Sequence, residues 1–126
     1  MTVKKIKNSF KDKRGIIRDV LVNAPMDTIT YIESAPGTVR ANHYHKKSTQ
    51  YDYIIEGKMV CAFRDGFDGK ITKKTVSAGS LIFHPKNQHH AYKAIEKTKF
   101  ISITKGPRRG EDYEKDTYRL TEPLLS

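Results

Sequence analysis

Hydrophobic and polar residues alternate along most of the chain in short runs. Such runs, rich in β-branched and aromatic residues, favour strands over helices. Seven of them cover residues 28–33, 51–56, 58–64, 71–77, 80–84, 90–95 and 99–104. Turn-forming residues such as those of the "DGFDGK" segment separate the runs. Many short strands joined by turns predict an all-β fold, a single antiparallel barrel or jelly-roll sandwich.

The two ends of the chain depart from this pattern. A chain of 126 residues has room for one domain with a modest core. We expect that domain to have its barrel at residues 28–105, an N-terminal strand arm at 1–27 and a C-terminal arm at 106–126. Within the C-terminal arm, "GEDYEKDTYRL" is expected to form a short helix or an irregular segment.

The net charge of +10 raises the question of an anionic partner. Basic residues crowd the first part of the chain, at Lys4, Lys5, Lys7, Lys11, Lys13 and Arg14. The chain contains no helix-turn-helix pattern, glycine-rich phosphate loop or aromatic RNA-binding signature, so a nucleic-acid partner is disfavoured. A basic rim would instead attract an anionic small molecule such as a nucleotide diphosphate, and the attraction would weaken with salt.

Hydropathy and cysteine content narrow the cellular setting. No apolar run approaches the roughly 20 residues of a membrane-spanning helix, and "MTVKKIKNSF" lacks the apolar stretch of a secretory signal. We therefore expect a soluble, cytoplasmic protein without a membrane partner. Cys61 is the single cysteine, which excludes an internal disulfide and a cysteine-based zinc cage.

The segment "GTVRANHYHKKSTQYDYIIEG", residues 37–57, carries the candidate chemistry. Residues two apart on a strand point to the same face, so His43 and His45 project together. If the strand enters a hairpin, Gln50 and Asp52 can lie on the facing strand. Three further histidines follow at His84, His89 and His90. A lone strand histidine is usually structural, but this concentration favours a functional site.

These residues resemble the two motifs of the cupin family. In the first motif, Gly37, His43, His45 and Gly57 fit every spacing, and Gln50 stands where the family has glutamate. In the second, the matching residues are Gly79, Pro85 and His90, with Asn87 in place of a glycine. The resemblance implies a jelly-roll barrel whose cavity is lined by His43, His45, Gln50 and His90.

A narrower resemblance concerns sugar-nucleotide cupins. "RANHYHKKSTQ" is similar to the "R-G-x-H-A-H-K-K-x-x-Q" stretch of the dTDP-4-keto-6-deoxyglucose 3,4-ketoisomerases, with Ala41 in place of the glycine. "SFKDKRGIIRD" resembles the "D-x-R-G" opening of the dTDP-4-keto sugar 3,5-epimerases, and "EDYEKDTYRL" resembles their C-terminal segments. The resemblance implies an isomerase or epimerase that acts on an anionic keto-sugar nucleotide and needs no cofactor.

That chemistry assigns roles to residues. A base removes a proton from the carbon beside a ketone, and a donor stabilises the enolate oxygen. His43 or His45 is the expected base, with Arg40 or Tyr31 as donor. The expected substrate-binding residues are Gln50, Asp52, His90 and Lys47. Because Arg40 precedes His43 by three positions, both can face one cavity only through a bulge or local turn; otherwise Arg40 is a surface charge.

Two alternatives use the same barrel differently. His43, His45 and His90 could hold a divalent transition metal, with Gln50 as a weak, uncharged fourth ligand, in a dioxygenase-like enzyme or a metal-assisted isomerase. A non-catalytic sugar- or small-ligand-binding cupin would need neither metal nor proton transfer.

The sequence also bears on assembly. Small cupins resemble one another in forming dimers, and tyrosine-rich strands such as "YDY" offer apolar surface to cover. We expect a homodimer in which the N-terminal segment can cross to the partner.

Overall fold

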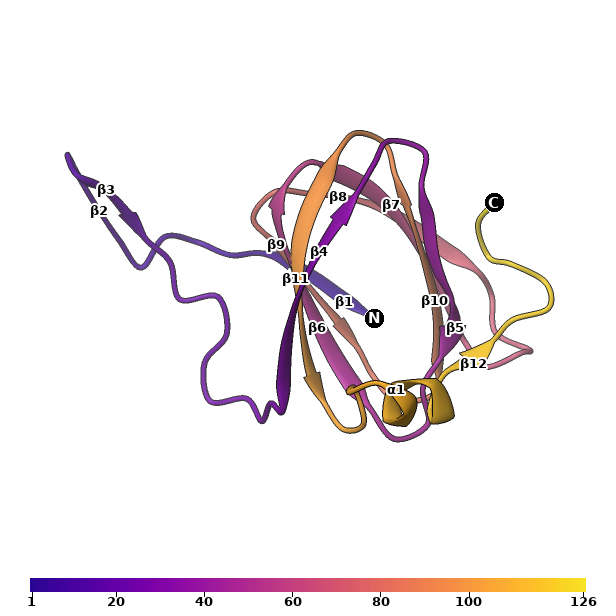
Figure 1. Ribbon diagram of the computed structural model, residues 1–126. Helices are drawn as coiled ribbons and strands as arrows, with labels where there is room; N and C mark the ends of the chain where they lie inside the picture. Colours follow the sequence, from indigo (N-terminus) through magenta and orange to yellow (C-terminus); the bar gives the residue numbers. More distant parts are fainter.

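Two antiparallel sheets dominate the computed structural model, which describes residues 1–126 (Figure 1). The first sheet contains, in spatial order, β1 (Thr2–Lys5), β9 (Ser80–His84), β6 (Thr49–Glu56), β11 (Thr98–Lys105) and β4 (Thr28–Ser34). The second contains β12 (Tyr118–Arg119), β5 (Val39–Tyr44), β10 (Gln88–Ala94), β7 (Lys58–Asp65) and β8 (Thr72–Ser77). A separate hairpin pairs β2 (Phe10–Asp12) with β3 (Gly15–Ile17), and the single helix is α1 (Glu111–Lys115). The prediction of an antiparallel jelly roll is confirmed.

The two sheets face each other and enclose the core. Alternation along β6 sends Gln50, Asp52 and Ile54 inward, where all three are buried. Ile54 joins an apolar cluster with Met59 and Phe100, whereas Gln50 and Asp52 belong to a polar region. The barrel interior is therefore divided into an apolar part that supplies hydrophobic stability and a polar part that is available for chemistry.

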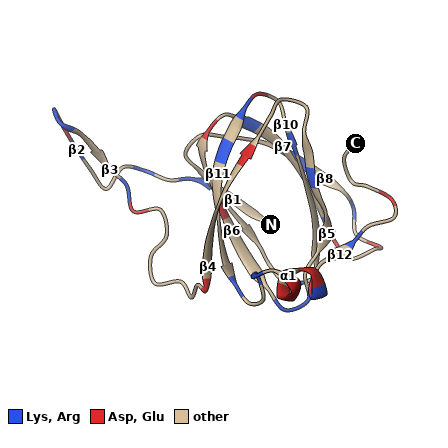
Figure 2. Cartoon of the chain, viewed as in Figure 1, with Lys and Arg blue, Asp and Glu red and all other residues tan.

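The N-terminal segment is divided between barrel and solvent. β1 pairs with β9 at the edge of the first sheet, although the sequence suggested an arm over all of residues 1–27. The β2–β3 hairpin stands away from the barrel (Figure 1), and Phe10, Ile16 and Ile17 are each more than half exposed. Figure 2 shows basic residues on this hairpin and a concentration of acidic residues on α1.

A bulge in β5 explains how Arg40 and His43 can face the same cavity although they are three residues apart. His43 pairs with His90 and Ala41 pairs with Ala91, which leaves Asn42 as an extra residue. Both bulge residues are left-handed, with φ of 70° at Ala41 and 54° at Asn42. Arg40 and His43 consequently line the same cavity. Asn87 also adopts positive φ, 66°, which explains why asparagine can replace the glycine of the second motif.

Replacing Ala41 by glycine should raise the free energy of unfolding by up to about 1 kcal/mol. Left-handed backbone costs a residue with a Cβ about 1–2 kcal/mol, and the greater unfolded-state entropy of glycine returns part of that gain. Urea unfolding followed by circular dichroism measures the effect. Ala91→Gly, at the paired position in β10, is the control and should destabilise the protein. A lower midpoint for Ala41→Gly than for the parent would contradict this account of the bulge.

Candidate active site

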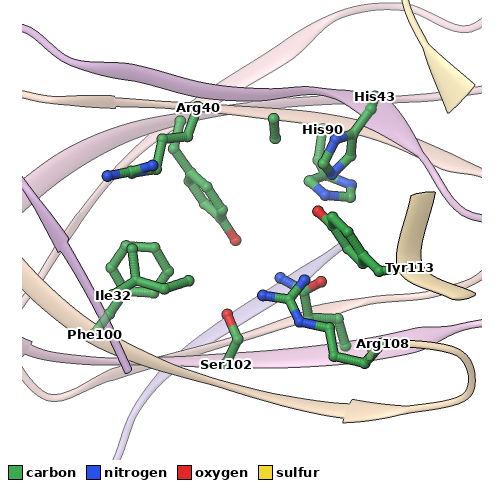
Figure 3. A pocket seen from close by; sticks show the side chains of 11 residues that line it. Ile32, Arg40, His43, His90, Phe100, Ser102, Arg108 and Tyr113 are labelled. Carbon is green, nitrogen blue, oxygen red and sulfur yellow. The ribbon is translucent and has the colours of Figure 1, made fainter. Parts of the chain in front are cut away.

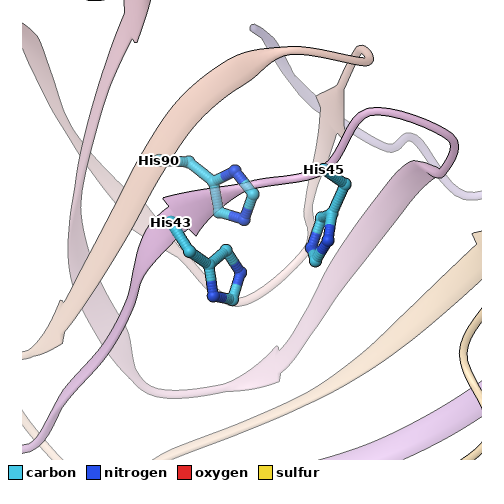
Figure 4. Close-up of side chains that lie close together, drawn as sticks. All are labelled: His43, His45 and His90. Atoms are coloured by element: carbon cyan, nitrogen blue, oxygen red, sulfur yellow. The ribbon is translucent and has the colours of Figure 1, made fainter. Parts of the chain in front are cut away.

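Three histidines meet in the polar part of the barrel (Figure 4). His43 lies on β5, His45 follows that strand directly, and His90 lies opposite His43 on β10. Their ring centroids are 4.6 Å apart for His43–His45, 4.8 Å for His43–His90 and 5.7 Å for His45–His90. All three are buried, so the cluster predicted from the two motifs is present in the fold.

Backbone carbonyls fix the tautomers of two of these rings. Nδ1 of His45 lies 2.9 Å from the carbonyl oxygen of Asp116, and Nδ1 of His90 lies 3.3 Å from that of Gln88. A carbonyl only accepts, so each Nδ1 carries the hydrogen and each Nε2 keeps a lone pair. Neither Nε2 has a hydrogen-bond partner in the protein. These atoms are therefore able to accept a proton or bind a cation.

Burial keeps the cluster uncharged. Desolvation, together with the neighbouring His45 and Arg119, lowers the pKa of His43 to about 3. Desolvation also lowers the pKa of His45 and places that of His90 well below its usual range. All three imidazoles are consequently neutral at pH 7, the form required of a base or a metal ligand.

A cavity of about 260 Å³ adjoins the histidines (Figure 3). It is lined by Ile32, Arg40, Ala41, His43, Gln50, His90, Tyr92, Phe100, Ser102, Arg108 and Tyr113. Two guanidinium groups belong to this lining, and no carboxylate does. The cavity therefore favours a ligand that carries or develops negative charge.

Arg40 lies across the cavity from His43 and His90 (Figure 3). Its Nε donates to Ser34 Oγ at 2.7 Å, and its Nη2 donates to the carbonyl oxygen of Glu33 at 2.8 Å. The guanidinium is thus anchored while Nη1 stays free of protein partners. Arg40 is better placed to hold a distant part of a ligand than to act beside the histidines.

Arg108 and Tyr113 were not among the residues expected from the sequence. Tyr113 lies on α1, with its ring centroid 6.4 Å from that of His43. The Arg108 guanidinium stacks on the Tyr113 ring at 4.3 Å, and both point into the cavity (Figure 3). The only sequence signal was the resemblance of "EDYEKDTYRL" to a family segment, which did not indicate that this segment reaches the histidines.

Four expected site residues are not part of the cavity lining: His45 and Asp52 are buried next to it, whereas Tyr31 and Lys47 lie elsewhere. Tyr31 points outward from β4, is 57% exposed and donates to Glu33 Oε1, because the inward positions of that strand belong to Thr30 and Ile32. Tyr113 occupies the place beside the histidines that Tyr31 was expected to hold. Lys47 is exposed outside the cavity lining, and the structure shows no side-chain contact between it and the histidine cluster.

Asp52 lies beneath the cavity and is completely buried. It accepts hydrogen bonds from Gln50 Nε2 at 2.9 and 3.0 Å, from Ser102 Oγ at 2.5 Å and from the Tyr92 hydroxyl, and His84 Nε2 lies 3.3 Å away. Burial acts to raise the pKa of Asp52, but the hydrogen bonds from His84, Ser102 and Tyr92 outweigh it and hold that pKa below its usual range. The buried carboxylate is therefore ionised and fully partnered.

Asp116 connects the C-terminal arm to the histidines. Its carboxylate accepts from the backbone N–H groups of Lys46, Lys47 and Ser48 and from the Ser48 hydroxyl. Its own carbonyl receives the His45 Nδ1–H. One residue thus fixes the turn between β5 and β6 and the orientation of the His45 ring.

Several solved structures have the same fold as this chain. The chain superposes on a dTDP-4-dehydrorhamnose 3,5-epimerase from Sulfolobus tokodaii with a TM-score of 0.80 and 17% identity, covering 98% of this chain and 78% of that one. It superposes on a 3,4-ketoisomerase from Helicobacter canadensis with a TM-score of 0.79 and 17% identity, covering 94% and 90%. Both likenesses support the cupin-type jelly roll expected from the motifs.

A curated relative matches over a shorter stretch. A germin-like protein, subfamily 3 member 2, of Arabidopsis thaliana is 27% identical over 55 residues, which make up 44% of this chain and 24% of that protein.

Residues 10–118 match the family described as the polysaccharide biosynthesis C-terminal domain. The match includes the histidine cluster, the bulge in β5 and the helix that carries Tyr113. The chain therefore belongs to the polysaccharide biosynthesis C-terminal domain family.

Proposed function

We propose that the protein is an isomerase or epimerase that acts on a keto-sugar nucleotide by histidine-mediated proton transfer. The observation that carries this proposal is the neutral His43 imidazole facing a cavity with two guanidinium groups and no carboxylate in its lining. The known structures named above include a dTDP-sugar epimerase and a 3,4-ketoisomerase, and the match to them supports the substrate class.

The reaction needs one base and a site for negative charge. His43 takes the hydrogen from the carbon beside the ketone, and the electron pair of the broken C–H bond forms the enolate. In isomerisation, the hydroxyl proton of that carbon passes to the former ketone oxygen, and a proton returns to the former carbonyl carbon. In epimerisation, water supplies a proton to the original carbon from the opposite face, and His43 releases the proton that it took to water. Protons and electrons balance in both cases without an oxidant.

The enolate is the difficult species, because its oxygen carries the charge that leaves the C–H bond. Arg108 and the Tyr113 hydroxyl lie on the same side of the cavity as His43 (Figure 3). Donors positioned in a water-poor cavity stabilise such charge more strongly than water does. Burial lowers the pKa of His43 and so makes it a weak base. The same water-poor cavity, however, also lowers the energy of the enolate.

The volume of the cavity indicates which part of the substrate it would hold. Drug-sized ligands fill pockets of about 300–1,000 Å³, so 260 Å³ accommodates a sugar ring and leaves the nucleotide at the mouth. Arg40 lies on the same strand as His43, three residues away, and its side chain is at the other end of the cavity, where a phosphate could approach it. This division agrees with the anionic small-molecule substrate expected from the net charge.

Isotope exchange tests the proposed function. Incubation of the protein with dTDP-4-keto-6-deoxyglucose in D₂O should place deuterium on a carbon beside the ketone, which mass spectrometry and NMR detect. Formation of the 3-keto isomer would identify isomerisation, and inversion at carbon 3 or 5 would identify epimerisation. Binding of the sugar nucleotide without exchange would favour the alternative of a non-catalytic binding protein.

The cluster also fits a divalent transition metal. One ring nitrogen from each of His43, His45 and His90 lies within 4.8 Å of the others, and Nε2 of His45 and Nε2 of His90 have no hydrogen-bond partner. A bound metal would polarise a ketone oxygen as a Lewis acid. Gln50 would be a weak fourth ligand, since its Nε2 is bonded to Asp52 and only its neutral Oε1 is left. Loss of exchange on treatment with a chelator would favour this alternative.

A homodimer is proposed from the outer face of the first sheet. Ile29, Tyr31 and Ile55 are exposed there, and a hollow of about 500 Å³ separates this sheet from residues 19–25 of the N-terminal segment. The hollow is lined largely by apolar side chains, among them Val20, Leu21, Tyr51, Leu81 and Phe83. The occupant that fits is a second copy of the chain, whose own outer face and projecting hairpin are apolar in the same way.

Light scattering at micromolar concentration should give the mass of a dimer. Ile29→Asp should shift the protein toward monomer, because a charge would be buried in the interface. Ile71→Asp is the matched control, since Ile71 is also exposed but lies next to the outer strand of the second sheet. A monomeric parent, or dissociation caused equally by both substitutions, would contradict the proposed interface.

A further inference from the structure

Asp52 fixes the hydrogen-bonding direction of the side chains above it. An ionised carboxylate only accepts hydrogen bonds, so every group that bonds to it must turn a hydrogen toward it. Gln50 Nε2, Ser102 Oγ and the Tyr92 hydroxyl all do so. Burial and the nearby Asp52 raise the pKa of Tyr92 well above its usual range, which keeps its hydroxyl protonated and donating.

His84 completes this arrangement from the other side. Its Nε2 contacts both the Tyr92 hydroxyl and Asp52 Oδ2. Because the tyrosine hydrogen is committed to Asp52, His84 Nε2 must carry a hydrogen of its own to make these contacts favourable. The His84 ring also stacks on His90, with centroids 4.3 Å apart and an interplanar angle of 27°. The network is thereby held rigidly beside the histidine cluster.

Gln50, Ser102 and Tyr92, the three side chains that donate to Asp52, also line the cavity. The hydroxyl hydrogens of Ser102 and Tyr92, and one Nε2 hydrogen of Gln50, point down toward Asp52, which leaves three acceptor oxygens for a ligand: Gln50 Oε1, Ser102 Oγ and the Tyr92 oxygen. Gln50 Oε1 has no partner in the protein, since both hydrogen bonds of this side chain are made by Nε2. We call these three residues the acceptor floor. The opposite polarity is found at Arg40, Arg108 and Tyr113, which supply donors.

We propose that Asp52 is a positioning residue that turns the three oxygens of the acceptor floor toward the cavity as hydrogen-bond acceptors, so that a sugar hydroxyl binds there and the ketone is directed to Arg108 and Tyr113. A hydroxyl can donate to these three oxygens, whereas a ketone oxygen would face their lone pairs. The floor therefore disfavours the keto group, which is oriented toward the donors beside His43. This inference rests on the proposed function and adds to it the orientation of the sugar.

Asp52→Asn tests the inference because it keeps the shape and reverses part of the polarity. An asparagine Nδ2 must donate, so Gln50 or another floor residue has to turn and present a hydrogen to the cavity. The probes are dTDP and dTDP-glucose, measured by calorimetry. In the parent, dTDP-glucose should bind about tenfold more tightly than dTDP, as expected for one or two additional net hydrogen bonds. In Asp52→Asn, this sugar-dependent gain should disappear while the affinity for dTDP stays within about twofold.

Two further variants keep the test decisive. Ser102→Ala removes one acceptor from the floor without placing a new donor beneath it, and should reduce the sugar-dependent gain if Asp52→Asn does not fold. Thr98→Val is the control, because Thr98 is completely buried on the same strand as Ser102 but lies outside the cavity lining. It should leave both dissociation constants unchanged.

The outcomes separate this inference from the proposed function. A sugar-dependent gain that persists in Asp52→Asn and Ser102→Ala would overturn the acceptor floor, as would a parent that binds both probes equally. In either case, deuterium exchange by the parent would leave the proposed function standing. A parent that neither binds the probes nor catalyses exchange would overturn both.

Discussion

Asparagine in place of His43 is expected to lower the rate of deuterium exchange into the keto sugar by about 10²–10⁴-fold, the usual contribution of a positioned general base. Asparagine preserves polarity and approximate size but cannot take the proton at neutral pH. The affinity for dTDP should change little, because the proposed nucleotide position is at the mouth of the cavity. Single-turnover exchange, measured beside calorimetry, separates the chemical step from binding.

His89→Asn is the matched control for this substitution. His89 is as buried as His90, but it stacks on Tyr44 with ring centroids 4.6 Å apart and accepts a hydrogen bond from Arg64, away from the cavity lining. It should retain exchange. If His43→Asn exchanged at the parental rate, His43 would not be the base, and the proposed mechanism would have to be abandoned.

The pH dependence of the parent provides a second measurement of the same residue. With its pKa at about 3, His43 is in the base form above about pH 5, so kcat/KM should not fall between pH 8 and pH 5 on its account. Stability behaves differently. The unfolded chain binds a proton near pH 6.5 that the folded histidine excludes, so the free energy of unfolding should decrease as the pH falls below that value. A fall in kcat/KM centred near pH 6.5 would contradict the assignment.

Glutamate in place of Gln50 is expected to destabilise the protein by about 3 kcal/mol at pH 8 and to abolish exchange. The substitution replaces a donor with a second carboxylate against buried Asp52, and removing one partner of a buried charged pair costs about 3–5 kcal/mol. The pair will share a proton, so the folded-state pKa of the new glutamate lies above its unfolded value. The penalty is therefore small below about pH 4 and grows as the pH rises through the folded-state pKa.

The same variant separates the proton-transfer and metal interpretations. A carboxylate at position 50 would supply the charged ligand that the glutamine lacks, so a metal centre would gain affinity and retain activity. Urea unfolding at pH 5 and pH 8, with and without Mn²⁺, and elemental analysis measure both effects. Gln50→Leu removes the donor without adding charge, and it should show no comparable pH dependence. Full exchange activity together with tighter metal binding would contradict the metal-free proton-transfer mechanism and favour a metal-assisted isomerase.

The structure also accounts for the glutamine that departs from the family motif. Asp52 lies two residues further along β6 on the same inward face, so the site already contains one buried carboxylate. A glutamate at position 50 would place a second negative charge within hydrogen-bond distance of the first. Glutamine instead donates to both Asp52 oxygens.

Local periodicity and motif spacing were sufficient to predict the barrel and the histidine cluster. Strand alternation places His43 and His45 on one face, and the second motif adds His90 from the neighbouring strand. The bulge that admits Arg40 could be stated only as a condition, because left-handed backbone at Ala41 is not a preference of alanine. Tyr31 was expected at the site, but its parity along β4 turns it outward.

The residues that could not be predicted depend on long-range packing. Arg108 and Tyr113 reach the cavity because the C-terminal arm folds back over the barrel. The hydrophobic pattern of "GEDYEKDTYRL" does not predict where this arm packs. The role of Asp52 also depends on tertiary structure. Its partners Tyr92 and Ser102 come from two other strands, and one of them lies in the opposite sheet.

The clamp formed by Asp116 has a consequence for synthesis on the ribosome. The strands that carry His43 and His90, and the turn that carries His45, are made before Asp116 is added, but the orientation of the His45 ring depends on the carbonyl of Asp116. Tyr113 is likewise supplied by the last part of the chain. A nascent barrel can therefore collapse before its site is complete, because the His45 ring is not oriented and Tyr113 is missing until residues 108–116 have folded back over the opening.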